Sequence, residues 1–249
     1  MAKRVLICGE TWMTSSTHVK GFDSFSACTM DGGVRFLREA LQAGGYEVTH
    51  MPAHIAAEEF PYTLEELSRY DCVIFSDIGA NTFLLPAAVF VRGERRPNRL
   101  NLVEEYVRAG GAFMMVGGYL TFTGFQAKGF YAGTAAERVL PVRLSRYDDR
   151  VELPQGGIPV GVKADHPVLA GVGGDWPYLL GYNRAELRED AELVASIEGD
   201  PFIAVREVGR GRTAVFTSDC APHWCSPDFV AWEHYGTIWR NLVGWLTRA

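Results

Sequence analysis

The chain has 249 residues, 47% of them hydrophobic, which is enough to bury the core of one large domain. Its formal net charge is −6, and its Lys and Arg residues are scattered or paired with acids. This pattern argues against a nucleic-acid or anionic membrane surface and favours a small-molecule or protein partner. No apolar run reaches the length of a membrane span or a secretory signal, so we expect a cytoplasmic protein.

The first half of the chain alternates short apolar runs with amphipathic segments. Strands are expected at residues 4–8, 46–49, 71–76 and 112–116. Helices are expected after an N-cap at Asp31, at a capping box from Thr63 to Glu66, and over residues 98–109. This alternation implies right-handed crossovers and a doubly wound, mostly parallel α/β sheet.

The segment 11–30 is unusually polar and follows the first strand. It contains His18, Lys20 and Asp23 among aromatic residues, which predicts an ordered loop that contributes to a site. The structural alternative is a polar loop held by local side-chain to backbone hydrogen bonds. A loop at the carboxyl end of a strand would bring these three side chains to the ligand.

The second half of the chain is expected to be richer in β-structure. The segment of about 125–205 predicts an antiparallel extension of the sheet, within a single domain that spans residues 1–249. Clearer signals follow in a strand at 213–217, which leads to a polar loop, and in a closing amphipathic helix at 235–247. Like the strand at 4–8, the late strand is therefore followed directly by polar residues.

The apolar run Ala112–Val116, followed by Gly117, Gly118 and Tyr119, predicts a buried strand with a sharp elbow at its carboxyl end. Ligands of open α/β sheets bind beyond such ends. Glu10, His18, Asp77, Tyr119 and His223 are therefore expected to line one pocket, with the N–H groups of 118–120 pointing into it. The candidate catalytic residues are Tyr119, Asp219 and His223, and the candidate ligand-binding residues are Glu10, Trp12, His18, Lys20, Asp23, Asp77, Asn81, Gly118 and Trp224.

Two of these groups have structural alternatives. Asp77 and Asn81 suit a sugar hydroxyl but also suit turn hydrogen bonds around a glycine. Asp219 and His223 suit an orienting pair for general base catalysis, or else a capped turn beside a packed imidazole. We expect no cofactor and no metal, because the histidines lack H-E-x-x-H or H-x-H spacing.

Several motifs together resemble a known family. They are the V-G-G-Y elbow, D-H-P-V-L-A-G at 165–171, G-x-G-R-x-x-x-F-x-S-D at 209–219, A-P-H-W at 221–224 and G-E-T-W at 9–12. In these motifs the chain resembles the class I glutamine amidotransferase-like family, whose relatives include ThuA-like proteins. The resemblance implies a flavodoxin-like, three-layer α/β/α sandwich with the pocket at the elbow, but fold alone does not imply activity.

The chain departs from the family pattern at the nucleophile. A glutaminase of this kind has a Cys in a G-x-C-x-G elbow and a His-x-Glu pair, whereas Gly118 and Tyr119 stand at this elbow and no acid follows His223 at that spacing. The five cysteines are odd in number and lack a C-x-x-C pair, so reduced and mostly buried thiols are expected. Standard glutaminase activity is therefore not expected.

The leading functional hypothesis is an amidotransferase-like protein that binds a small polar metabolite, a carbohydrate or an amide. It would hydrolyse or isomerise that ligand without a cysteine nucleophile. The alternative, from another class, is a catalytically inert binding subunit or the scaffold subunit of a homo-oligomer. An open pocket with convergent polar groups favours the first hypothesis, and an elbow plugged by Tyr119 and Phe122 favours the second.

Overall fold

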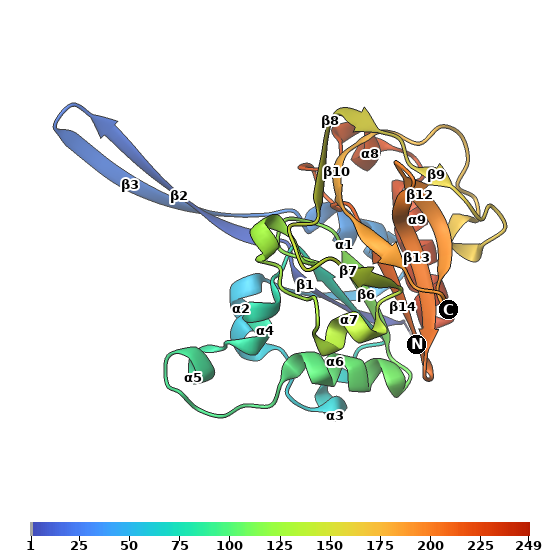
Figure 1. Cartoon of the computed structure of the whole chain (residues 1–249), viewed down its shortest axis with the longest axis horizontal. Coiled ribbons are helices and arrows are strands. Elements are labelled where there is room, and N and C mark those ends of the chain that lie inside the picture. The colour runs from blue at the N-terminus through green and yellow to red at the C-terminus, as the bar shows by residue number, and fades with distance from the viewer. Residues whose placement is uncertain (1) are drawn as a thin grey trace.

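Successive side chains of the central strands enter two different cores. In β1 (Arg4–Gly9), Val5 and Ile7 belong to one buried cluster, while Leu6 and Cys8 belong to the other. Because side chains alternate along a strand, an apolar run of this kind requires cover on both faces. The computed structural model, which describes residues 2–249, shows this three-layer α/β/α arrangement (Figure 1).

The central sheet has eight strands in the order β4-β1-β5-β6-β14-β13-β12-β9. Strands β4, β1, β5, β6 and β14 are mutually parallel, and the three strands beyond β14 pair antiparallel. This confirms the mostly parallel sheet with an antiparallel extension. The remaining strands of this sheet are β4 (Glu47–Met51), β5 (Cys72–Ser76), β6 (Ala112–Val116), β9 (Val160–Gly161), β12 (Glu192–Ile197), β13 (Asp200–Val208) and β14 (Gly211–Phe216).

Helices cover both faces of the sheet. The face of Val5 is covered by α1 (Arg35–Ala43), α8 (Pro227–Ala231) and α9 (Tyr235–Thr247), with the short 3-10 helix η2 (Pro167–Leu169) beside them. The helices of the face of Leu6 are α2 (Ala53–Glu59), α3 (Leu64–Leu67), α4 (Ala80–Leu84), α6 (Arg99–Arg108) and α7 (Ala135–Val139). Helix α5 (Ala87–Phe90) and the 3-10 helix η1 (Phe125–Ala127) complete the helical segments of residues 2–249. None of the described helices is long and apolar enough to cross a membrane.

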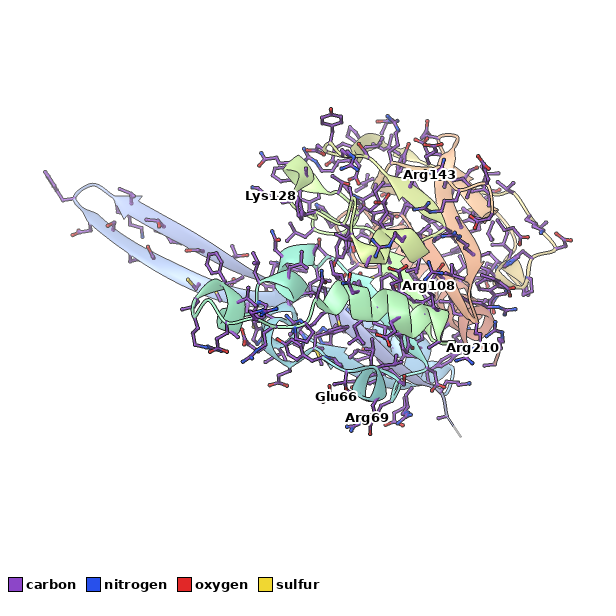
Figure 2. All side chains as sticks on the ribbon, turned by 60° about the horizontal axis from the view of Figure 1, so that its bottom comes forward. Glu66, Arg69, Arg108, Lys128, Arg143 and Arg210 are labelled. Carbon is purple, nitrogen blue, oxygen red and sulfur yellow. The ribbon has the colours of Figure 1, made fainter. Side chains whose placement is uncertain are left out.

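Arg99, the first residue of α6, is fully buried and joins three helices of one layer. Its guanidinium donates hydrogen bonds to main-chain oxygens of α2, α4 and the residue that follows α2. Most other charged side chains lie outside, as the labelled residues of Figure 2 illustrate. The acceptors of Arg99 are the carbonyl oxygens of Ala56, Ala57, Phe60, Thr82 and Phe83, at 2.7–3.4 Å.

Several expectations about local structure are wrong. The polar segment 11–30 is not a loop but a hairpin of β2 (Thr11–Lys20) and β3 (Asp23–Gly32), and Asp31 lies in β3 instead of capping α1. Alternating Ser and Thr residues suit an exposed ribbon as well as a loop, so polarity alone misleads.

Two small sheets lie outside the central one. Strand β8 (Arg150–Gly157) pairs with β10 (Leu179–Asn183), and β7 (Val142–Leu144) pairs with β11 (Ala185–Leu187). All four strands lie within the segment of about 125–205, for which β-structure was expected. The β8–β10 sheet contributes side chains to the candidate site described next.

Candidate functional site

The carboxyl ends of β1, β5, β6 and β14 meet at one edge of the sheet, because these four strands are adjacent and parallel. A cavity of about 400 Å3 lies there. It contains polar residues that follow each of the four strands, as the sequence predicted for parallel neighbours. Its lining residues are Glu10, Trp12, Asp77, Tyr119, Asp219, Ala221, Pro222 and His223.

Glu10 forms the buried floor of this cavity and is only 1% exposed. Its backbone is left-handed, with φ 52°, and its N–H donates to the carbonyl of Ser76 at 2.9 Å. The Ser76 hydroxyl donates a short hydrogen bond to Oε1 of Glu10. Burial, reinforced by the charges of Asp219 and Asp77, raises the pKa of Glu10 well above its usual value.

Asp77 is the second carboxyl group and also has a left-handed backbone, with φ 42°. Its Oδ1 accepts the N–H of Leu120 at 2.8 Å. A Cβ at Gly118 would lie 2.7 Å from this oxygen, so the glycine permits the close approach. Burial, followed by the charge of Asp219, raises the pKa of Asp77 to about 6.

Two N–H groups of the elbow are bonded within the protein and are not free for a ligand, contrary to expectation. Leu120 donates to Asp77, and Gly118 donates to Oδ1 of Asn183 at 3.0 Å. Asn183 in turn donates to the carbonyl of Gly118 and to Oδ1 of Asp149, which holds the elbow rigidly. The prediction of free donors for an anion is therefore wrong at these two positions.

Asp219 and His223 form a close pair, with 3.4 Å between Oδ2 and Nδ1. Asp219 is buried and its Oδ1 also accepts the N–H of Ala221, so it both shapes the turn and orients the imidazole. The hydrogen bond that the His223 ring donates to Asp219 raises the pKa of His223. The imidazole is 46% exposed, so it has access to solvent and to a ligand in the cavity.

Tyr119 forms one wall of the cavity and contacts His223 edge-on, with 4.5 Å between the ring centroids. Its hydroxyl donates to Oε1 of Glu152 at 3.0 Å. Nε1 of Trp224 donates to the other oxygen of Glu152, and the indole is buried behind Tyr119. Trp224 therefore supports the wall and does not itself line the cavity.

The sequence analysis missed Glu152, Asn183 and Asp149, which hold Tyr119 and the elbow in place. Glu152 and Asn183 lie in β8 and β10, which pair across a long stretch of chain. No local pattern in the sequence links these residues to the elbow. They can be recognised only after the two strands are placed side by side.

Six expected ligand-binding residues are not part of the cavity lining, and they include Gly118 and the buried Trp224. His18, Lys20 and Asp23 lie near the tip of the β2–β3 hairpin, where the His18 ring stacks on Phe25. Asn81 is an exposed residue of α4 and is not part of the lining. The expectation that His18 shares a pocket with Tyr119 and His223 is wrong, because the hairpin carries it away from the sheet edge.

One group of potential metal ligands occurs at the floor of the cavity among the described residues. Single ligand atoms of Glu10, Asp219 and Cys220 lie within 4.8 Å of one another. Burial raises the pKa of both Glu10 and the Cys220 thiol well above their usual values. A cation would have to displace these protons before it could bind.

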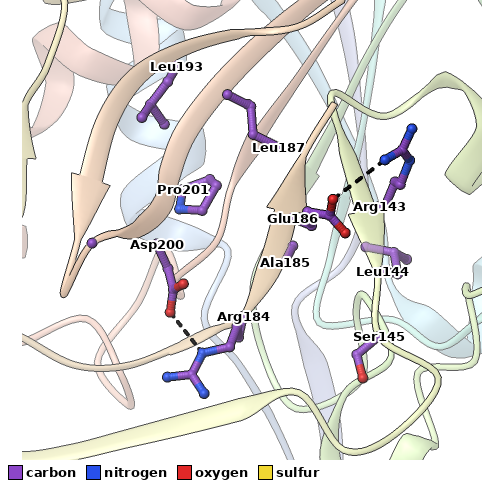
Figure 3. A pocket seen from close by; sticks show the side chains of 11 residues that line it. Arg143, Leu144, Ser145, Arg184, Ala185, Glu186, Leu187, Leu193, Asp200 and Pro201 are labelled. Atoms are coloured by element: carbon purple, nitrogen blue, oxygen red, sulfur yellow. Dashed lines mark hydrogen bonds and ion pairs between the residues drawn. The ribbon is translucent and has the colours of Figure 1, made fainter. Parts of the chain in front are cut away.

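A second cavity, of about 540 Å3, lies beside β7, β11 and β13 (Figure 3). Its charged side chains pair with one another, Arg143 with Glu186 at 3.5 Å and Arg184 with Asp200 at 2.8 Å. These pairs leave little free polar capacity for a ligand. We therefore assign the candidate site to the sheet edge.

Comparisons with known proteins agree with this fold. A family model described as "Putative glutamine amidotransferase" matches residues 4–248. Cytoplasmic protein STM3548 from Salmonella typhimurium is 42% identical, with TM-score 0.94 over 97% of this chain and 98% of its own. Cytoplasmic protein STM1381 from Salmonella typhimurium LT2 is 42% identical, with TM-score 0.93 over 98% of this chain and 99% of its own.

A more distant structure shares the fold alone. A ThuA-like protein from Bacteroides uniformis is 12% identical, with TM-score 0.58 over 98% of this chain and 91% of its own. A search of curated proteins found no match. The family match spans nearly the whole chain, so this protein belongs to the glutamine amidotransferase-like family.

Proposed function

We propose that the cavity at the sheet edge binds a small, neutral polar metabolite, a carbohydrate or an amide, and transfers protons to and from it. The observation that carries this proposal is the convergence of three carboxyl groups and an imidazole in one cavity. The carboxyl groups belong to Glu10, Asp77 and Asp219, and the imidazole belongs to His223. Such a set of convergent polar groups is typical of ligand sites.

The chemistry of the lining favours a neutral ligand over an anion. Carboxyl groups accept hydrogen bonds from hydroxyl and amide N–H groups, and the clustered acids repel a carboxylate or phosphate. The elbow N–H groups at 118 and 120, which would attract an anion, are already bonded within the protein. The rings of Trp12 and Tyr119 offer apolar faces to the carbon skeleton of a sugar.

The acid and base roles follow from the environments of the side chains. Burial raises the pKa of Glu10 and so favours its protonated form, which suits a general acid. His223, oriented by Asp219, suits a proton carrier that switches between acid and base. Together these groups support hydrolysis or isomerisation of the bound ligand without a covalent intermediate on cysteine.

A thiol mechanism finds no support at this site. Tyr119 occupies the elbow, and the nearest thiol, that of Cys220, is fully buried with a raised pKa. We therefore expect no ammonia release from glutamine that depends on a cysteine. The cavity is also not plugged, since Phe122 is buried elsewhere and does not line it. We place this function in the cytoplasm, the compartment named for the two Salmonella relatives.

The test is a thermal-shift screen of sugars, polyols, amides and amino acids. A ligand that binds only the folded protein raises Tm in proportion to the logarithm of its concentration above Kd. The decisive pair of variants is His223→Gln and His18→Gln, which make the same change inside and outside the cavity. We expect a neutral ligand to stabilise the wild type and His18→Gln but not His223→Gln. A panel without any neutral ligand, or equal losses in both variants, would contradict the proposal.

A further inference from the structure

The β2–β3 hairpin projects from the body as a long two-stranded arm (Figure 1). Ten residue pairs join the strands in unbroken register, from Thr11 with Gly32 to Lys20 with Asp23. The turn consists of Gly21 and Phe22, and Gly21 has φ 65°, as the first residue of a type II′ turn requires. Within residues 2–249 neither strand pairs with any other strand.

The arm exposes several large apolar side chains to solvent. All residues of β2 except Thr11, and all residues of β3, are exposed. Met13 is 69% exposed, Val19 is 71% exposed and Phe22, at the tip, is fully exposed. An isolated two-stranded ribbon is marginally stable in water, and it gains stability when a face is covered. The arm therefore has the properties of a surface that another molecule covers.

The two faces of the arm differ in charge. Directly paired residues share a face, and alternate pairs lie on opposite faces. One face carries the charged or titratable residues His18, Lys20, Asp23 and Asp31, together with Trp12 and Phe25. The other face, which we call the uncharged face, has no charged side chain along its whole length. It consists of Thr11, Met13, Ser15, Thr17, Val19, Ser24, Ser26, Cys28, Met30 and Gly32.

We infer that the uncharged face is the contact surface of a homodimer, in which the arms of two copies pack face to face and antiparallel. The face is self-complementary in this orientation. Met13 and Met30 form a bulky root, small Ser, Thr and Cys side chains form the middle, and Val19 projects near the tip. A two-fold axis at the middle places each tip on the root of the other arm, as an isologous interface requires.

The arm alone supplies part of the area that a stable interface needs. Ten residues per strand span about 34 Å, and a two-stranded ribbon is about 10 Å wide, so the two packed faces bury roughly 700 Å2. A stable interface needs about 1,200 Å2 or more. In the proposed packing the exposed Phe22 at each tip lies at the root of the opposite arm and adds to the buried area.

The test compares Ser15→Lys with Ser16→Lys in the full-length protein. These neighbours are the same residue type, both are exposed, and they lie on opposite faces of the arm. Sedimentation equilibrium and light scattering give the mass in solution. We expect two chains for the wild type and for Ser16→Lys, and one chain for Ser15→Lys, because the two-fold packing brings the new ammonium groups together in an apolar contact. Circular dichroism and Tm of the body check that each variant folds.

A second measurement uses Cys28, which lies on the uncharged face and is the one exposed cysteine in the described part of the chain. We expect a maleimide to modify it slowly in the wild type and at least tenfold faster in Ser15→Lys. A wild type that remains a single chain across the micromolar range would overturn the inference. A dimer that survives Ser15→Lys, or that Ser16→Lys disrupts equally, would overturn it as well.

Discussion

Asp77 combines a raised pKa with a fixed hydrogen bond, and this makes the stability of the protein depend on pH. Its pKa is about 6 in the folded chain against an ordinary value of 3.8. The folded state therefore binds more protons between these values, so the free energy of unfolding falls as pH rises from about 4 to about 6. Asp77→Asn cannot ionise but can still accept the N–H of Leu120.

We therefore compare the free energy of unfolding of Asp77→Asn with that of the wild type at two pH values. We expect the difference, variant minus wild type, to be about 1–3 kcal/mol larger at pH 7 than at pH 4. Urea unfolding at several pH values measures this difference. Asp175→Asn, which makes the same substitution at an exposed carboxylate, serves as the control. A difference between Asp77→Asn and the wild type that does not vary with pH would contradict the role assigned to burial.

Gly33 makes room for the floor of the cavity. A Cβ at this position would lie 2.5 Å from Oε2 of Glu10 and 2.8 Å from Cβ of Ala221. We expect Gly33→Ala to cost about 1–3 kcal/mol, because overpacking displaces neighbours. Gly173→Ala, where nothing lies within 4 Å of the new Cβ, should change stability little or increase it slightly. Equal effects of the two substitutions in chemical unfolding would show that Gly33 is not tightly enclosed.

Much of the candidate site could be predicted residue by residue, because a polar residue directly after a buried parallel strand lies at a known edge. Glu10, Asp77, Tyr119 and His223 share a cavity for this reason. Their catalytic and ligand-binding roles remain predictions. Glu152 was missed because its position depends on a strand pairing far from the elbow in sequence.

At the level of elements, the N-cap of α6 offers a clear test. The side chain of Asn98 accepts the N–H groups of Leu100 and Asn101 at 2.9 and 3.4 Å. We expect Asn98→Ala to lower the free energy of unfolding by about 1 kcal/mol. Asn101→Ala, three residues further in the same helix, should be neutral or slightly stabilising since Ala is the better helix former. Thermal and urea unfolding distinguish them, and a larger loss for Asn101→Ala would refute the capping account.

The elements predicted best are those with local signals at both ends. The capping box at Thr63, the helix expected over residues 98–109 and the helix Tyr235–Thr247 are confirmed. The β2–β3 hairpin was not recognised, because its exposed faces lack the apolar alternation of a half-buried strand. Strand β8 contains Pro154 and two glycines, which locally favour a loop, and its pairing with β10 overrides that preference.

At the scale of the whole molecule, the fully buried Arg99 places a charge inside one of the two helical layers. We expect Arg99→Lys to cost about 2–4 kcal/mol, because an ammonium group keeps the buried charge but cannot reach the five carbonyl oxygens together. Arg108→Lys, at an exposed ion pair with Glu104, should cost under about 0.5 kcal/mol. Chemical unfolding compares them, and similar small losses would mean that water satisfies those carbonyl groups.

The three-layer architecture could be predicted from the alternation of apolar strands and amphipathic helices along the chain. Strands that are apolar on both faces need helices on both sides of the sheet. The family resemblance and the matching family model agree with that prediction. The projecting arm could not be predicted in this way. No other part of residues 2–249 covers it, so its sequence lacks the apolar periodicity of an element that packs on the core.

The hydrogen bonds of the elbow have a consequence for any attempt to place a cysteine there. The thiol of Tyr119→Cys would stand beside N–H groups already bonded to Asn183 and Asp77. The negative charge that develops on a carbonyl oxygen during thiol attack would find no free donor there. The single substitution Tyr119→Cys would therefore not produce a glutaminase. The hydrogen bonds that Asn183 and Asp77 accept from the elbow would have to be removed as well.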